Sequence, residues 1–222
     1  MNLSALLQLA DSGFPSGAFA HSFGLETAID AGRVHDAPTL ALWLRSYLLE
    51  SLAPLDGGAA ALVFAGTDPL LIDGFLSAAI FAAEVRAATS AIARSTLATF
   101  CALELQNQRI VAYEQAIYDG RADGHAAIAA ALGYEAAGVD CEDALRAFFS
   151  ASLASLGAAA SRAVPLGQRS VSAVLWALRV PIDEAVRVSR SIETPDGLHA
   201  QAFAQEIDAL GHCRLNGRLF AS

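Results

Sequence analysis

The sequence predicts an all-α protein, and three observations carry this prediction. Ala supplies 49 of the 222 residues, and Ala is the strongest helix former but a poor strand former. Apolar side chains recur at the three- and four-residue spacing of a helix, whereas strand-like alternation never persists for more than a few residues. Hydrophobic residues make up 55% of the chain, which excludes disorder. We therefore expect residues 1–222 to form one all-α domain, a bundle of about eight to ten helices.

The first half of the chain is expected to hold helices separated by Gly- and Pro-containing connections. A short apolar opening is followed by the loop Asp11–Ser22, which Gly, Pro and Ser interrupt. Asp36 and Asp68 are expected helix caps, because each precedes a proline suited to a first helical turn. The expected helices are Leu3–Ala10, Leu25–Ala31, a helix from Asp36 to Leu52, Ala59–Ala65, and two helices between Asp68 and Leu105 that meet near Glu84–Ala88. We expect Pro54–Gly58 to break the chain.

The second half shows the same pattern and then a short tail. Asp140 resembles the start of a capping box and opens the longest expected helix, which Pro165 ends. Gly211 ends the last helix, and residues 212–222 form an irregular tail that we expect to dock on a partner or on the chain itself. The helices expected here are Arg109–Asp119, His125–Ala137, Asp140 to Pro165, Gln168–Val180, Ile182–Glu193 and Leu198–Leu210.

Charge and cysteine content exclude several classes of protein. The net charge is −9, and all 14 basic residues are Arg. A chain without Lys has no P-loop lysine or Schiff-base lysine, and the absence of a basic stripe argues against nucleic-acid binding. The longest stretch without charge, Ala147–Ser161, is shorter than a membrane span. Three scattered Cys do not form a disulfide framework, which favours the cytoplasm.

The common catalytic signatures are absent from the sequence. It contains no G-x-S-x-G, H-E-x-x-H or C-x-x-C, so we expect no catalytic and no cofactor-binding residues, and a binding or scaffolding protein rather than an enzyme. The metal-ligand candidates are Asp208, His212 and Cys213, although a helix C-terminus with a dipole-favoured His explains the same spacing. The alternative hypothesis is a helical ligand-binding protein or enzyme with a pocket formed by His125, Arg162 and Gln168.

Three segments of the chain resemble the UreF family of urease accessory proteins. The first is Leu6–Glu26, LLQLADSGFPSGAFAHSFGLE, and the second runs from His125 to the Arg-x-x-Pro-Leu-Gly-Gln that ends at Gln168. The third is the terminal Arg-Leu-Phe-Ala-Ser, residues 218–222. The middle helix departs from the family, because only Glu84, Arg86 and Arg94 remain of its Arg-rich run.

The resemblance implies an all-α homodimer that is a non-catalytic chaperone for nickel insertion into urease. Such proteins bridge a UreD-like protein, which contacts apo-urease, and the GTPase UreG, whose GTP hydrolysis they are thought to modulate. Nickel and GTP would be bound by these partners, so no cofactor is expected on this chain. The candidate partner-binding residues are Phe14, Pro15, Phe19, Ser22, Glu26, Arg86, Pro165, Leu166, Gly167, Gln168, Arg218, Leu219 and Phe220.

Overall fold

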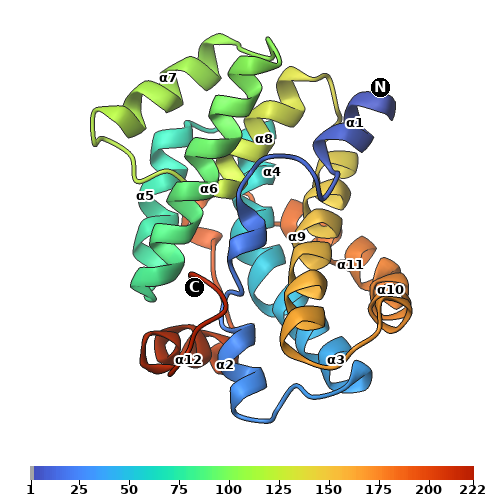
Figure 1. Cartoon of the computed structure of the whole chain (residues 1–222). Coiled ribbons are helices and arrows are strands. Elements are labelled where there is room, and N and C mark those ends of the chain that lie inside the picture. The colour runs from blue at the N-terminus through green and yellow to red at the C-terminus, as the bar shows by residue number, and fades with distance from the viewer. Residues whose placement is uncertain (1–2) are drawn as a thin grey trace.

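The all-α prediction is confirmed. The structure, a computed structural model, describes residues 3–222, and within this range it contains helices and no strand (Figure 1). The α-helices are α1 (Leu3–Leu9), α2 (Leu25–Asp30), α3 (Ala37–Tyr47), α4 (Gly58–Phe64), α5 (Pro69–Ala79), α6 (Ala83–Ala102), α7 (Gln108–Tyr118), α8 (Ala126–Ala136), α9 (Cys141–Ala163), α10 (Gln168–Ala177), α11 (Arg179–Arg190) and α12 (Phe203–Gly211). Shorter helical segments are η1 (Ala18–Ala20), η2 (Leu48–Gly57), η3 (Pro195–Gly197) and η4 (His212–Arg214). The α-helices in this range outnumber the expected eight to ten.

The predicted aspartate caps start their helices as expected. Asp36 accepts a hydrogen bond from the backbone N–H of Thr39 at the start of α3. Asp68 accepts from the N–H of Leu70 at the start of α5, and Asp140 accepts from the N–H of Asp143 at the start of α9. Each cap satisfies one of the N–H groups that a helix leaves unpaired at its first turn.

The predicted break at Pro54–Gly58 is wrong. Residues 48–57 form the π-helical segment η2, which joins α3 to α4 in one continuous run from Ala37 to Phe64. Proline clashes with the carbonyl of residue i−4 in an α-helix, and the wider π turn relieves this clash. The carbonyl of Glu50, four residues before Pro54, accepts instead from the N–H of Gln201 at 2.6 Å. The carbonyl of Ala53 accepts from the N–H of Gly58 and from the hydroxyl of Ser189 on α11, the latter at 2.9 Å. A buried π-helical segment can therefore accommodate a proline that, from the sequence alone, predicts a break in the helix.

Three predicted boundaries move by a few residues. The break between α5 and α6 lies at Ile80–Ala82 rather than near Glu84–Ala88. Pro181 falls inside the first turn of α11, where its missing N–H costs nothing. The last helix begins at Phe203 rather than Leu198, because the backbone N–H of Gln201 bonds the carbonyl of Glu50 on η2 at 2.6 Å.

The run from Ala37 to Phe64 is long and apolar enough, by length and composition, to cross a membrane. Within the structure, 67% of its most apolar stretch is buried against other helices. Leu40, Leu44 and Leu48 on this run belong to the main hydrophobic core and are fully buried. The run therefore serves as the central core helix of this fold.

Candidate functional site

The C-terminal tail lies along the segment that precedes α2 and is held there by main-chain hydrogen bonds. The N–H and the hydroxyl of Ser22 both donate to the main-chain oxygen of Ser222, at 2.6 Å each. The N–H of Ala221 donates to the carbonyl of Ala20 at 2.8 Å, and His21 Nδ1 lies 3.0 Å from Ser222 Oγ. Two segments about 200 residues apart in sequence thus lie side by side, joined by main-chain hydrogen bonds.

Glu26 on α2 is the buried carboxylate that fixes the tail. It is only 7% exposed, and it accepts from the N–H groups of Leu219 at 2.6 Å and Phe220 at 3.2 Å. The same carboxylate lies 2.9 Å from Nε2 of His212, a fully buried side chain directly after α12. Glu26 therefore links the end of α12 and the tail to α2.

Glu84 on α6 closes the cluster from the other side. One oxygen lies 2.7 Å from His212 Nδ1, and the other accepts from the guanidinium of Arg218 at 2.7 Å. The imidazole of His212 therefore lies between two carboxylates, one on α2 and one on α6. We call the following residues the tail clasp: Ser22, Glu26, Glu84, Arg162, His212 and residues 218–222.

Arg162 at the end of α9 completes the clasp with cation–π contacts. Its guanidinium lies 3.8 Å from the ring centre of Phe19 and 4.5 Å from that of Phe220. It also donates to the carbonyl of Phe19 at 2.8 Å. The guanidinium therefore lies against the rings of both Phe19, in the loop, and Phe220, in the tail.

The clasp leaves two large apolar side chains in solvent. Phe220 is buried, but Leu219 is 64% exposed and Phe19 is 57% exposed. The bonds that hold residue 219 come from its main chain, so its side chain is free to contact another molecule. Of the candidate partner-binding residues, the structure brings Phe19, Ser22, Glu26, Arg218, Leu219 and Phe220 together here.

Phe14 and Pro15 lie apart from these residues. The ring of Phe14 is half-buried and packs 5.6 Å from that of Phe100 on α6. The carbonyl of Pro15 accepts from the hydroxyls of Ser95 and Thr99, also on α6. These contacts anchor the loop to α6, while Pro15 stays exposed.

Arg86 supports the connection between α5 and α6. Its guanidinium donates to the carbonyls of Ile80 and Phe81, at 2.6 and 2.9 Å. The side chain thus compensates backbone groups that the helices leave unpaired.

The Pro-Leu-Gly-Gln segment forms the turn between α9 and α10. Pro165, Gly167 and Gln168 are exposed, and Leu166 packs against the core. The turn begins three residues after Arg162. It connects the end of α9, where Arg162 contacts the tail, to the start of α10.

The three metal-ligand candidates do not form a ligand cluster. Asp208 pairs with Arg33, and burial raises the pKa of its carboxyl. His212 is held between two glutamates, and the exposed thiol of Cys213 donates to the carbonyl of Leu210. The three residues are close in sequence, but each side chain contacts a different neighbour in the structure.

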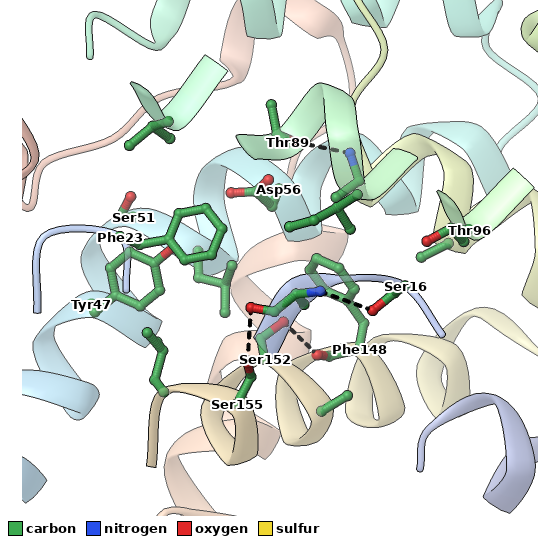
Figure 2. A pocket seen from close by; sticks show the side chains of 18 of the residues that line it. Ser16, Phe23, Tyr47, Ser51, Asp56, Thr89, Thr96, Phe148, Ser152 and Ser155 are labelled. Atoms are coloured by element: carbon green, nitrogen blue, oxygen red, sulfur yellow. Dashed lines mark hydrogen bonds between the residues drawn. The ribbon is translucent and has the colours of Figure 1, made fainter. Parts of the chain in front are cut away.

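The pocket proposed around His125, Arg162 and Gln168 is also not formed. His125 is buried and lies 2.9 Å from the hydroxyl of Ser77 on α5, whereas Arg162 belongs to the clasp and Gln168 faces solvent. A different cavity of about 360 Å³ lies between the loop, η2, α6 and α9. Figure 2 shows Asp56 directed into it, with Phe23, Tyr47 and Phe148 nearby. Burial raises the pKa of the Asp56 carboxyl from 3.8 to about 7.

Replacing Asp56 with Asn is expected to stabilise the protein at high pH. The raised pKa means that folding favours the protonated carboxyl, so its stabilising contribution is complete below about pH 4 and is lost as pH rises through about 7. One pKa unit corresponds to about 1.4 kcal/mol, so the Asp56→Asn advantage should grow by on the order of 2–4 kcal/mol across this window. Urea unfolding of both proteins from pH 4 to 8 measures it, and a difference that does not change with pH contradicts the expectation.

The part that Glu84 and His212 take in the tail clasp was not predicted from the sequence. Glu84 lies 128 residues from His212, and Glu26 lies 186 residues from it. No local pattern connects groups at such separations, so only the folded chain reveals them. Arg162 could be recognised from the sequence as a candidate, because it is the first residue of the Arg-x-x-Pro-Leu-Gly-Gln motif.

Comparison with known proteins identifies the family of this chain. The family model described as UreF matches residues 34–179. Urease accessory protein UreF of Paenarthrobacter aurescens is 36% identical, with 98% of this chain and 97% of the relative covered. The proteins of the same name from Arthrobacter sp. strain FB24 and Corynebacterium glutamicum are 32% and 33% identical, each with 98% of this chain and 96% of the relative covered. A match of this extent and similarity shows that the chain belongs to the UreF family.

Proposed function

We propose that this chain is a non-catalytic scaffold in urease maturation. In this proposal it acts in the cytoplasm and bridges a UreD-like protein, which contacts apo-urease, and a UreG-like GTPase. Nickel is the cargo of the complex, and GTP is bound by the partner. The scaffold could also modulate how GTP hydrolysis is coupled to nickel transfer. Membership of the UreF family supports the role in urease maturation.

The tail clasp is the observation that carries the bridging role. A chain end is usually frayed unless it is tied down, and here main-chain bonds to Ser22 and Glu26 hold it in place. The clasp orders Leu219 and Phe19 while leaving both exposed. Apolar side chains that stay exposed together mark a contact surface, and aromatic residues and arginine, here Phe19 and Arg162, are enriched at protein interfaces. We assign this surface to the UreD-like partner.

Replacing Leu219 with Ala is expected to weaken binding of the UreD-like protein by about tenfold or more, because the anchor is removed while the main-chain bonds stay. Affinity measured with the purified UreD-like protein gives the result. Leu42→Ala is the matched control, since Leu42 on α3 is 70% exposed and lies outside the clasp. Equal losses in both variants, or none, would remove the tail from the proposed interface.

We also propose that the chain forms a homodimer. Its dimer contact requires an exposed apolar surface other than the one beside the tail clasp. α12 has one, because Phe203, Ile207 and Leu210 are 71%, 66% and 48% exposed at helical spacing. Phe81 is 68% exposed, and its N–H bonds Glu206 on the same helix. Contiguous exposed apolar side chains mark interaction surfaces, so we place the contact with a second copy here.

Replacing Ile207 with Asp is expected to shift the protein from dimer to monomer, because a charge cannot be buried in this contact without a partner. Light scattering at several protein concentrations measures the mass. Val180→Asp on α11 is the matched control, because Val180 is 76% exposed and lies outside the proposed contact surface. A wild-type protein that is monomeric, or a variant that stays dimeric, contradicts this assignment.

A further inference from the structure

A second polar cluster lies outside the clasp, where α5, α7 and the connection before α8 meet. Asp73 lies on α5, and Asp123 and His125 lie in the connection. One ring nitrogen of His125 and one carboxylate oxygen of each aspartate lie within 4.8 Å of one another. One imidazole and two carboxylates at this separation form a possible set of cation ligands.

Asp73 is already oriented by the backbone around it. One carboxylate oxygen accepts from the hydroxyl of Tyr113 at 2.7 Å and from the N–H of Gly124 at 3.1 Å. The other oxygen accepts only from the N–H of Asp123, at 2.9 Å. A carboxylate has about four lone-pair positions, so one position on this second oxygen stays available. The carboxylate is thus fixed before any ligand arrives.

His125 provides the observation that points to an occupant. The residue is 1% exposed, its Nε2 lies 2.9 Å from Ser77 Oγ, and its Nδ1 is buried without a hydrogen-bond partner. An unpartnered buried nitrogen costs about 1–3 kcal/mol, which folding normally avoids. A bound ion would satisfy it, and the bond between Ser77 and Nε2 would fix the tautomer that leaves Nδ1 free to ligate.

The cluster carries negative charge that no basic side chain balances. Asp73 is 3% exposed, and neither it nor Asp123 forms an ion pair with an Arg or His in residues 3–222. Asp123 is exposed and its carboxylate makes no hydrogen bond among the described residues. The site is therefore open to solvent on one side, where water can complete the coordination of an ion.

We propose that Asp73, Asp123 and His125 bind one first-row divalent cation, Ni²⁺ or Zn²⁺, with water in the remaining positions. Imidazole favours these ions over Mg²⁺ and Ca²⁺, which prefer all-oxygen sites. The exposed ligand Asp123 makes the site exchangeable rather than a closed structural centre. The site does not depend on the tail clasp or on its partners.

Metal titration of the full-length protein tests this site. Isothermal titration with Ni²⁺, Zn²⁺ and Mg²⁺ is expected to show one equivalent of Ni²⁺ or Zn²⁺ and no Mg²⁺ binding. Asp123→Asn and His125→Gln should each weaken binding at least about tenfold. Asp123 is exposed, so its variant retains the fold, which circular dichroism verifies. Asp119→Asn is the matched control, because Asp119 is an exposed carboxylate at the end of α7 that pairs with Arg121.

Cobalt absorption distinguishes the proposed ligands from others in the chain. Co²⁺ bound to nitrogen and oxygen gives weak visible bands, whereas a thiolate ligand adds a strong charge-transfer band in the near ultraviolet. We expect the weak bands in wild-type protein and their loss in Asp123→Asn. The proposal is overturned if no Ni²⁺ or Zn²⁺ binds, if binding is equal in the wild type and both variants, or if the thiolate band appears.

Discussion

Replacing Glu26 with Gln is expected to release the C-terminal tail and to lower the free energy of unfolding by about 3 kcal/mol. The N–H groups of Leu219 and Phe220 bond different carboxylate oxygens, and an amide has only one acceptor oxygen, so one of the two N–H groups loses its partner and faces an NH2 donor. His212 also loses one of its two carboxylate partners. These groups are buried, which makes each loss expensive.

Two measurements verify the effect of Glu26→Gln. Urea unfolding gives the change in stability, and hydrogen exchange by mass spectrometry gives the protection of residues 218–222. Glu193→Gln is the control, because Glu193 is exposed and surface changes stay within about 0.5 kcal/mol. Unchanged protection of the tail in Glu26→Gln would show that the carboxylate does not hold it.

Replacing Gly24 with Ala is expected to move α12 away from α2 and to cost about 2–4 kcal/mol. Gly24 adopts a left-handed backbone with φ 88°, which a side chain disfavours. An added Cβ would also lie 2.8 Å from the carbonyl oxygen of Gln205 and 2.9 Å from the backbone nitrogen of Ala209. Backbone atoms cannot rotate away, so the helix itself must shift and carry His212 out of the clasp.

Gly32→Ala separates the two contributions to this cost. Gly32 has φ 71°, but a Cβ there meets no atom within 4 Å. Its variant should therefore lose only the conformational term of about 1 kcal/mol. Thermal unfolding of both variants measures the difference, and exchange of the tail amides should rise only in Gly24→Ala. Equal costs at both positions contradict a close approach of α12 to α2.

Local chemistry made most helices predictable from the sequence. Asp36, Asp68 and Asp140 were expected as caps, and each one accepts the backbone hydrogen bond that a cap requires. Their effect depends on residues two or three positions away, which a sequence displays directly. The break predicted at Pro54 was wrong because its effect is not local. Whether this proline interrupts the helix depends on how α11 packs against it.

The clasp could be predicted only in part. The terminal residues 218–222 were expected to dock, and the structure shows them bound to the chain's own α2 and preceding loop. The bonds of Glu84 to Arg218 and His212 could not be predicted from the sequence, because contacts between distant residues depend on which helices meet. His125 was interpreted as part of a pocket with Arg162, yet its neighbours are Ser77 and Tyr113.

We expect the docked tail to form the surface that a partner recognises. Co-expressing the chain with UreD-like and UreG-like proteins, with and without residues 218–222, tests it most directly when light scattering gives the mass of each purified complex. Circular dichroism first establishes that the shortened chain is folded. We predict a ternary complex with the full chain and none with the shortened one. A ternary complex of unchanged mass with the shortened chain, or no complex with either partner when the full chain is folded, would contradict the account.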